Sequence, residues 1–297
     1  MLTGVHFLLT YHCTFECDHC FVFGSPDAKG TFTFIQVCQV LEQARQIDSV
    51  NTVYFEGGEA MLYYPLLIES IRQARRLGLQ VGIVTNAYFA TSEQDAALWF
   101  APLAQLGIAD LSISDDAFHS DEQDSPGKRA VRAAQKLGLP AASICIEQPT
   151  VIADAATGGK GKPIVGGGVM FRGRAAEKLT AGLPTRPWES FTECRHEDLA
   201  EPSRLHVDAY GNVHLCQGIS IGNLWETPLT KMMTEYRVEG HPIAGPLAEG
   251  GPALLAKEFQ VPVQDGYVDA CHLCYSVRKS LMERFPQYLA PRQMYGL

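Results

Sequence analysis

Residues 10–21 read Thr10-Tyr11-His12-Cys13-Thr14-Phe15-Glu16-Cys17-Asp18-His19-Cys20-Phe21, and three of the nine cysteines of the chain lie in this stretch. The apolar residues 4–9 before it have the length of one buried strand. The thiols are therefore expected in a loop at the carboxyl end of a strand, where a parallel α/β barrel keeps its chemistry. Thiols this close together bind metal or form disulfides, but a closed tetrahedral metal site would need a fourth ligand that is not a sulfur of this loop.

A second motif, Gly57-Gly58-Glu59, follows the next predicted strand, residues 52–56. Two glycines at the carboxyl end of a strand let the backbone bend sharply and approach a ligand closely, with N–H and C=O groups free to bind it. Alone, such a tripeptide indicates only a turn. Its position, one strand after the cysteine loop, favours a ligand-binding turn.

The Cys-x3-Cys-x2-Cys spacing of Cys13, Cys17 and Cys20, with the aromatic ring of His19 before the last cysteine, resembles the signature of the radical S-adenosylmethionine (SAM) superfamily. The resemblance implies that these thiolates hold a [4Fe-4S] cluster whose fourth iron binds SAM, and that the Gly-Gly-Glu motif holds the methionyl amino group of SAM. It also implies an enzyme that cleaves SAM to a 5'-deoxyadenosyl radical, which takes hydrogen from a substrate. The residues leave two alternatives open, a structural zinc site with His12 or His19 as fourth ligand and, less favoured, a disulfide knot.

Composition sets the class of protein. The chain has 297 residues, 46% of them hydrophobic and 19% charged, as in ordinary globular proteins. A formal charge of -9 argues against a broad nucleic-acid surface. No apolar run approaches the ~20 residues of a membrane span, and residues 1–10 lack the basic start of a signal peptide. Nine cysteines without an export signal predict a cytoplasmic protein whose clustered thiols bind metal.

Apolar periodicity predicts strands that alternate with helices. Six strands, without two further units, fit a partial (β/α)6 TIM-like radical SAM barrel better than a full eightfold barrel. We expect this core at residues 1–180 and a small α+β auxiliary-cluster domain at 181–297, with a linker near residues 184–187. The expected core strands are residues 4–9, 52–56, 80–85, 110–114, 142–147 and 169–171.

Further candidate site residues follow the later strands. The resemblance implies that Asn86 and Ser114 reach the SAM ribose and carboxylate, and each also fits a role as a strand-end cap. Asp116 and His119 are expected at the barrel mouth, where they would bind substrate or relay a proton, although a loop cap fits them equally. Glu147 is the remaining candidate, expected either in the cavity or as a solvated carboxylate.

A second cysteine set, Cys194, Cys216, Cys271 and Cys274, lies beyond the predicted linker. Four thiolates suffice for a [4Fe-4S] cluster or for zinc, and spacing alone does not separate the two. Residues 205–216 predict two strands joined by a Tyr-Gly-Asn turn. The phrase Asp-Ala-Tyr-Gly-Asn-Val-His-Leu-Cys, followed by Gly-Asn-Leu, resembles the SPASM/twitch extension of radical SAM enzymes. Because no cysteine follows Cys274, the shorter twitch type with one auxiliary [4Fe-4S] cluster is implied.

The remaining expectations concern loops, substrate and partners. Cys38 and Cys145 are expected to pack as small apolar residues. The Gly-rich residues 157–168 lack the pattern of a phosphate loop and are expected to form a lid or entrance loop. We expect no leader-peptide-binding domain of ordinary size before the first cysteine, so a leader peptide would need a separate carrier protein. We expect an electron donor such as flavodoxin or ferredoxin, and peptide modification, with small-molecule (sugar or alcohol) dehydrogenation or a non-catalytic iron-sulfur or zinc protein as alternatives.

Overall fold

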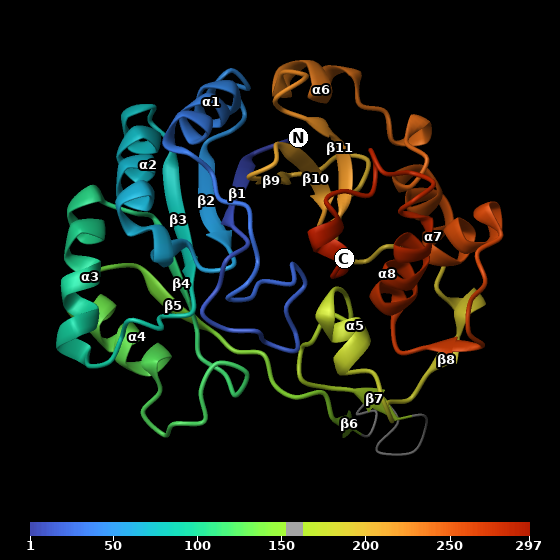
Figure 1. Cartoon of the computed structure of the whole chain (residues 1–297), viewed down its shortest axis with the longest axis horizontal. Helices are drawn as coiled ribbons and strands as arrows, with labels where there is room; N and C mark the ends of the chain where they lie inside the picture. Colours follow the sequence, from blue (N-terminus) through green and yellow to red (C-terminus); the bar gives the residue numbers. More distant parts are fainter. Residues whose placement is uncertain (153–162) are drawn as a thin grey trace.

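An eight-stranded sheet organises the computed structural model, which describes residues 1–152 and 163–297 (Figure 1). The expected Gly-rich segment falls partly on residues 157–162, which lie outside the described residues. Five core strands are parallel neighbours, as the apolar periodicity predicts. In sheet order the strands are β11 (Ile219–Asn223), β10 (Asn212–Cys216), β9 (Arg204–Asp208), β1 (Gly4–Thr10), β2 (Thr52–Gly57), β3 (Gln80–Thr85), β4 (Asp110–Ser114) and β5 (Ala141–Ile144).

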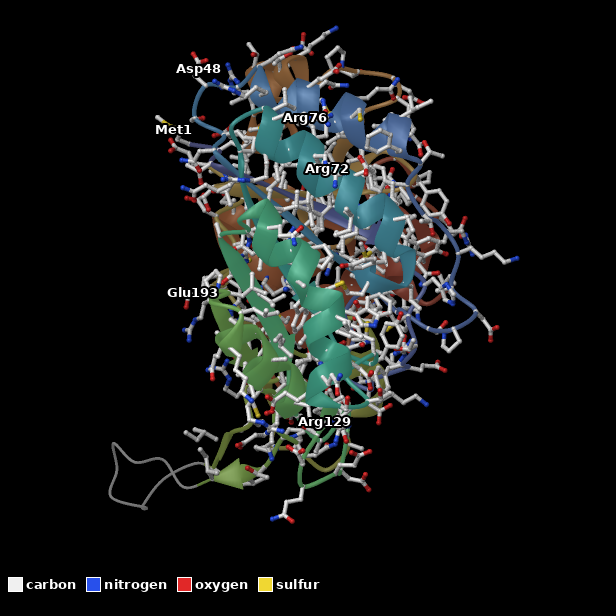
Figure 2. All side chains as sticks on the ribbon, turned by 90° about the vertical axis from the view of Figure 1, so that its left-hand side faces the viewer. Met1, Asp48, Arg72, Arg76, Arg129 and Glu193 are labelled. Atoms are coloured by element: carbon white, nitrogen blue, oxygen red, sulfur yellow. The ribbon has the colours of Figure 1, made fainter. Side chains whose placement is uncertain are left out.

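Four helices cover one face of this sheet, as Figure 1 shows. They are α1 (Phe34–Arg45), α2 (Tyr64–Arg76), α3 (Glu93–Leu106) and α4 (Pro126–Lys136). Figure 2 shows this helix layer with Arg72 and Arg76 of α2 on its outer side. Thr33 begins α1 with a capping box that it shares with Gln36. Beneath the helices the rings of Phe7 and Phe55 are fully buried and stack 5.0 Å apart, so the apolar face of the parallel strands forms the core.

The carboxyl-terminal part continues the same sheet. β9 pairs with β1 in parallel, and β10 pairs antiparallel with β9, so the expected hairpin around the Tyr-Gly-Asn turn is confirmed. β1 is consequently an interior strand with β2 on one side and β9 on the other. The sheet therefore crosses the expected boundary near residue 180, and the division into two domains stays a prediction.

The expected sixth strand, residues 169–171, does not form in the described part of the chain, so the expected (β/α)6 barrel is not completed. Instead, the chain turns back toward the cysteine loop, where the N–H of Arg174 donates to the carbonyl of Cys20. Without a strand beside it, β5 is the edge of the sheet. This explains why Cys145, expected in the core, is exposed.

Helices and short elements outside the eight-stranded sheet complete the described chain. α7 (Ala244–Phe259) and α8 (Ala270–Leu281) pack against each other. No helix of the described residues is long and apolar enough to cross a membrane. The other elements are η1 (Ala60–Tyr63), β6 (Val151–Ile152), β7 (Ile164–Val165), α5 (Arg174–Lys178), β8 (Arg186–Pro187), η3 (Trp188–Ser190), α6 (Leu229–Glu235), η4 (Val238–Gly240), β12 (Gly266–Tyr267) and η5 (Arg292–Tyr295).

Candidate functional site

A cavity at the carboxyl ends of β1 to β4 contains the first cysteine set. Cys13, Cys17 and Cys20 line it from the loop after β1. The structure thus brings together the three predicted cluster cysteines and most of the predicted SAM-binding residues. The predicted residues that line this cavity are Cys13, Cys17, Cys20, Gly57, Gly58, Asn86, Ser114 and His119.

Backbone donors surround the thiols of this loop. The N–H of Phe15 points to the sulfur of Cys13 at 3.4 Å, and the N–H of Gly24 points to the sulfur of Cys20 at 3.3 Å. Burial raises the pKa of Cys13 to about 11 and that of Cys17 to about 12. These thiols are therefore neutral at pH 7 unless a metal binds them, because coordination deprotonates a thiol.

The Gly-Gly pair lets the end of β2 touch the cysteine loop. The N–H of Gly58 donates to the carbonyl of Thr10 at 2.7 Å. A Cβ on Gly58 would lie 2.2 Å from the carbonyl oxygen of His12, and Gly57 has a φ of +128°, which a side chain would strain. The glycines are therefore required by the close approach of two backbones, and this approach places β2 beside the three sulfurs.

Glu59 is placed differently from the expectation that it holds the SAM amino group. Its side chain is buried, and its carboxylate accepts hydrogen bonds from the N–H of Met61 (2.9 Å), the hydroxyl of Thr85 (2.8 Å) and the N–H of Asn86 (2.7 Å). It does not line the cavity. Burial raises the pKa of Glu59 to about 7 against the effect of these donors. Glu59 thus ties the end of β3 to the end of β2.

Asn86 lies at the end of β3 and contacts the cysteine loop, and its expected contact with SAM stays a prediction. Its side-chain N–H₂ points to the sulfur of Cys13 at 3.5 Å and to the hydroxyl of Thr14 at 3.1 Å. Its side-chain oxygen accepts from the N–H of Tyr88, which caps the end of β3. Asn86 is therefore a strand-end cap that also contacts the cysteine loop.

The loop after β4 closes the cavity over the cysteines. Asp116 accepts a hydrogen bond from Nδ1 of His119 at 2.7 Å and two more from backbone N–H groups. Burial alone would raise the pKa of Asp116, but the bond and charge of His119 outweigh it and lower the pKa. The ring of His19 lies 4.5 Å from that of Phe118 and 5.5 Å from that of His119. Asp116 therefore positions His119 beside the cluster loop.

Glu147 is not part of this site. Its side chain is exposed and lies outside the residues that line the cavity. The reason is the same as for Cys145, because the chain after β5 has no sixth strand to hold it against the cavity. The interpretation of Glu147 as a cavity residue is therefore wrong, and its alternative as a solvated carboxylate agrees with the structure.

All four cysteines of the second set line one cavity. Cys216 ends β10, Cys271 and Cys274 lie in the first turn of α8, and Cys194 follows η3. Burial raises the pKa of Cys274 to about 11 and raises that of Cys271 as well. The structure thus joins residues that the sequence spreads over 81 positions, from 194 to 274.

Two buried arginines, missed in the sequence, face these sulfurs. Nη1 of Arg172 lies 3.1 Å from the sulfur of Cys216, and Arg172 and Arg278 both line the cavity. Their side chains are 6% and 2% exposed, so their charges have little solvent to stabilise them and need negative partners. Arg278 follows Cys274 by four residues on α8, and that helical spacing is a signal that could have found it.

The segment Arg172-Gly173-Arg174 links the two cysteine sites. The guanidinium of Arg172 lies 4.8 Å from the ring centre of Phe21, the residue after Cys20. Arg174 donates from its side chain to the carbonyls of Cys17 (2.7 Å) and Gly24 (3.1 Å). One short segment therefore contacts the loop of the first cysteine set and a sulfur of the second.

The spacing of the thiols bears on the kind of metal they suit. All nine cysteines are free. Among the described residues, no three cysteine sulfurs lie within 4.8 Å of one another. Two other groups have three potential ligand atoms within that distance, His6–Glu56–His206 and His19–Asp116–His119. Zinc with bonds of ~2.3 Å in a tetrahedron places its sulfur ligands ~3.8 Å apart, so both cysteine sets are wider than a zinc site.

Comparison with known protein families and curated proteins agrees with this geometry. Residues 7–146 match the model of the Radical SAM superfamily. The chain is 23% identical over 112 residues to "Putative peptide biosynthesis protein YydG" of Bacillus subtilis (strain 168), covering 38% of this chain and 35% of that protein. It is 31% identical over 149 residues to "PqqA peptide cyclase" of Streptomyces rochei, covering 46% of this chain and 38% of that protein. The chain thus spans well under half the length of these relatives.

Solved structures share the fold at low sequence identity. One, "Native anSMEcpe with bound AdoMet", has a TM-score of 0.53 and 10% identity, and the match covers 97% of this chain and 98% of that chain. Another, "Crystal structure of BtrN in complex with AdoMet and 2-DOIA", has a TM-score of 0.52 and 14% identity over 78% of this chain and 82% of that chain. The α/β fold with its mostly parallel sheet is therefore that of these proteins.

Proposed function

We propose that the chain, whose residues 7–146 match the radical SAM superfamily, is an enzyme of that superfamily that reductively cleaves SAM and modifies a peptide or protein by hydrogen abstraction. The cavity with Cys13, Cys17 and Cys20 is the observation that carries this proposal. Among the residues that line it there is no fourth cysteine. This donor set fits a [4Fe-4S] cluster with one iron free for SAM, and the bound cluster with SAM would supply the 5'-deoxyadenosyl radical.

The chain's own residues would position the reactants. The backbone at Gly57 and Gly58 lies against the cysteine loop and offers its polar groups to the methionyl end of SAM. Asn86 and Ser114 line the same cavity and are placed to contact the rest of SAM. Because Asp116 holds Nδ1 of His119, the other ring nitrogen of His119 is available to accept a proton from the substrate.

We assign the second cysteine set to one auxiliary [4Fe-4S] cluster. No three of these sulfurs lie within 4.8 Å of one another in the described part of the chain, which favours a cluster over a single zinc ion. A cluster with four thiolates carries net negative charge that Arg172 and Arg278 would balance. Residues 181–297, which carry this site, would form the auxiliary-cluster domain, and residues 1–180 the core. With all four irons ligated by protein, the cluster would serve electron transfer.

Cleavage of SAM tests the proposal directly. Anaerobic protein, reconstituted with iron and sulfide and reduced with dithionite, is expected to form methionine and 5'-deoxyadenosine. Cys17→Ala should abolish both products, because it removes a thiolate of the SAM-binding cluster. Cys145→Ala is the matched control, since Cys145 is exposed and lines neither cavity. If the reduced wild-type protein forms neither product, or if Cys17→Ala forms both, the proposal is wrong.

Metal analysis separates the clusters. Two clusters would give about eight irons per chain, and Cys17→Ala and Cys271→Ala should each leave about four. Wild-type protein with about four irons would reject the auxiliary cluster and leave the radical mechanism in place. Zinc without iron would instead support the non-catalytic zinc protein.

The names of two relatives, a peptide biosynthesis protein and a peptide cyclase, favour a peptide substrate. The alternative is oxidation of a small sugar or alcohol. Formation of 5'-deoxyadenosine, with reduced flavodoxin or ferredoxin as electron donor, should rise several-fold over background with candidate precursor peptides. A rise with sugar alcohols and none with peptides would select the dehydrogenase.

A further inference from the structure

A cluster of His6, Glu56 and His206 lies on the inner face of the sheet, and the roles assigned to the two cysteine sites use none of its residues. Successive side chains of a strand point to opposite faces. β1 buries Phe7 and its alternate neighbours against the helices, so His6 points to the opposite face. His6 is the register partner of His206 on β9, and Glu56 lies on β2, the other neighbour of β1. Strand pairing therefore brings the three side chains together.

The ligand atoms of the cluster converge on one point. Nε2 of His206 lies 3.0 Å and Nδ1 of His6 lies 3.4 Å from the same carboxylate oxygen of Glu56. The three ligand atoms lie within 4.8 Å of one another. Nδ1 of His6 is buried and has no hydrogen-bond partner despite this contact, and the buried Nδ1 of His206 has none either. Hydrogen bonding within the cluster thus leaves buried nitrogen atoms unsatisfied, which is costly.

Packing fixes the orientation of the cluster. The ring of Tyr54 stacks on that of His6 with centres 4.6 Å apart and planes 15° apart. The lack of a side chain at Gly82 makes room for this ring, because a Cβ there would lie 2.2 Å from it. The imidazole of His6 is therefore held in place before any ligand binds.

We propose that His6, Glu56 and His206 bind one divalent transition-metal ion. Two imidazoles and one carboxylate suit Zn²⁺, Fe²⁺ or Co²⁺ and leave coordination positions open. Ligands on an ion with bonds of ~2.1 Å lie between ~3.0 Å (octahedron) and ~3.4 Å (tetrahedron) apart. The separations of the Glu56 oxygen from the two imidazole nitrogens, 3.0 and 3.4 Å, lie in this range. Glu56 also lines the cavity of the first cysteine set. The ion would therefore present its open positions to a substrate carboxylate, hydroxyl or amine in that cavity.

The carboxylate of the other close group, His19, Asp116 and His119, is already occupied by hydrogen bonds. Its carboxylate already accepts from the N–H groups of Phe118 and Ile146 as well as from His119. These bonds give it a structural role in the loop after β4. In contrast, the polar contacts of the Glu56 carboxylate among the described residues are the two imidazoles.

Zinc binding tests the site in the full chain with its clusters reconstituted. The protein is incubated with excess ZnCl₂, desalted and analysed for zinc and iron. We expect Glu56→Gln, His6→Gln and His206→Gln each to carry about one zinc per chain less than wild type, with zinc affinity weakened at least about 10-fold. Glu42→Gln, an exposed carboxylate on α1, is the control and should retain the zinc. Unchanged iron content shows that the variants are folded.

Two results would overturn the site: wild type with no more zinc than the Glu56→Gln variant, or retention of the zinc by all three variants. Either result would mean that His6, Glu56 and His206 interact only with one another and bind no metal ion. The measurement uses neither SAM nor a reductant. If SAM is not cleaved, the proposed function is rejected and the metal site is unaffected. If zinc does not bind, the metal site is rejected and the proposed SAM cleavage is unaffected.

Discussion

Glu59 sets a pH dependence through a single buried carboxyl. Burial raises its pKa from 4.5 to about 7, so the folded protein binds this proton more tightly than the unfolded chain. Protonated Glu59 therefore contributes roughly 3 kcal/mol to the free energy of unfolding. This contribution is fully present below about pH 4.5 and is lost as the pH rises through 7. We expect the free energy of unfolding to fall between about pH 5 and pH 8 by more in wild type than in Glu59→Gln, measured by urea titration.

The Gln variant should also be less stable near pH 5, by about 1–3 kcal/mol, because its amide N–H₂ would face a backbone donor. That donor is the N–H of Asn86, from which the Glu59 carboxylate accepts a hydrogen bond in the wild-type protein. Parallel pH profiles for the two proteins would contradict the assignment of the raised pKa to Glu59.

Arg172 supplies charge to the second cysteine site. Arg172→Gln removes the guanidinium 3.1 Å from the sulfur of Cys216, so negative charge there loses its buried partner. We expect reconstituted Arg172→Gln to hold about four irons per chain instead of about eight, and Arg172→Lys to keep more. Arg76→Gln is the control, because Arg76 is exposed on α2 and lines neither cysteine cavity. Full iron content in Arg172→Gln would contradict this role.

At the scale of elements, the end of β2 and the cysteine loop must approach each other closely. Gly58→Ala would place a Cβ 2.2 Å from the carbonyl oxygen of His12, so one backbone has to shift. We expect a loss of about 1–3 kcal/mol in stability and loss of iron from the first site, measured by unfolding and iron analysis. Gly240→Ala is the control, since a Cβ there meets nothing within 4 Å. Equal iron in both variants would show that the loop tolerates the shift.

The edge position of β5 explains the wrong expectation for Cys145 and the exposure of Glu147. Residues 142–147 have the apolar pattern of a buried strand, but the structure ends the strand at Ile144 and leaves Cys145 and Glu147 exposed. The pattern of a strand does not state whether another strand will pair with it. Only the absence of a pairing partner beyond β5 in the described sheet decides this.

At the scale of the molecule, the interior position of β1 makes the two halves depend on each other. β1 pairs with β9 over residues 4–8, and the same strand leads into the cysteine loop. A chain that ends at residue 180 would leave this side of β1 unpaired, and such an edge aggregates. We expect residues 1–180 alone to aggregate and to bind no cluster, and co-expression with residues 181–297 to restore both, measured by gel filtration and iron content. A monomeric 1–180 fragment with about four irons would contradict this prediction.

Local sequence patterns predict the parallel strands and the two cysteine sets, because apolar periodicity and the spacing within a loop are local properties. They also point to the first cavity, since strands that run in parallel bring their carboxyl ends to one edge. The tertiary structure decided the contacts of Arg172 with Cys216 and the meeting of His6 with His206, which are 200 positions apart. Such contacts depend on which strands pair. The pairing energy is spread over the whole sheet, so a local sequence pattern does not reveal the pairing.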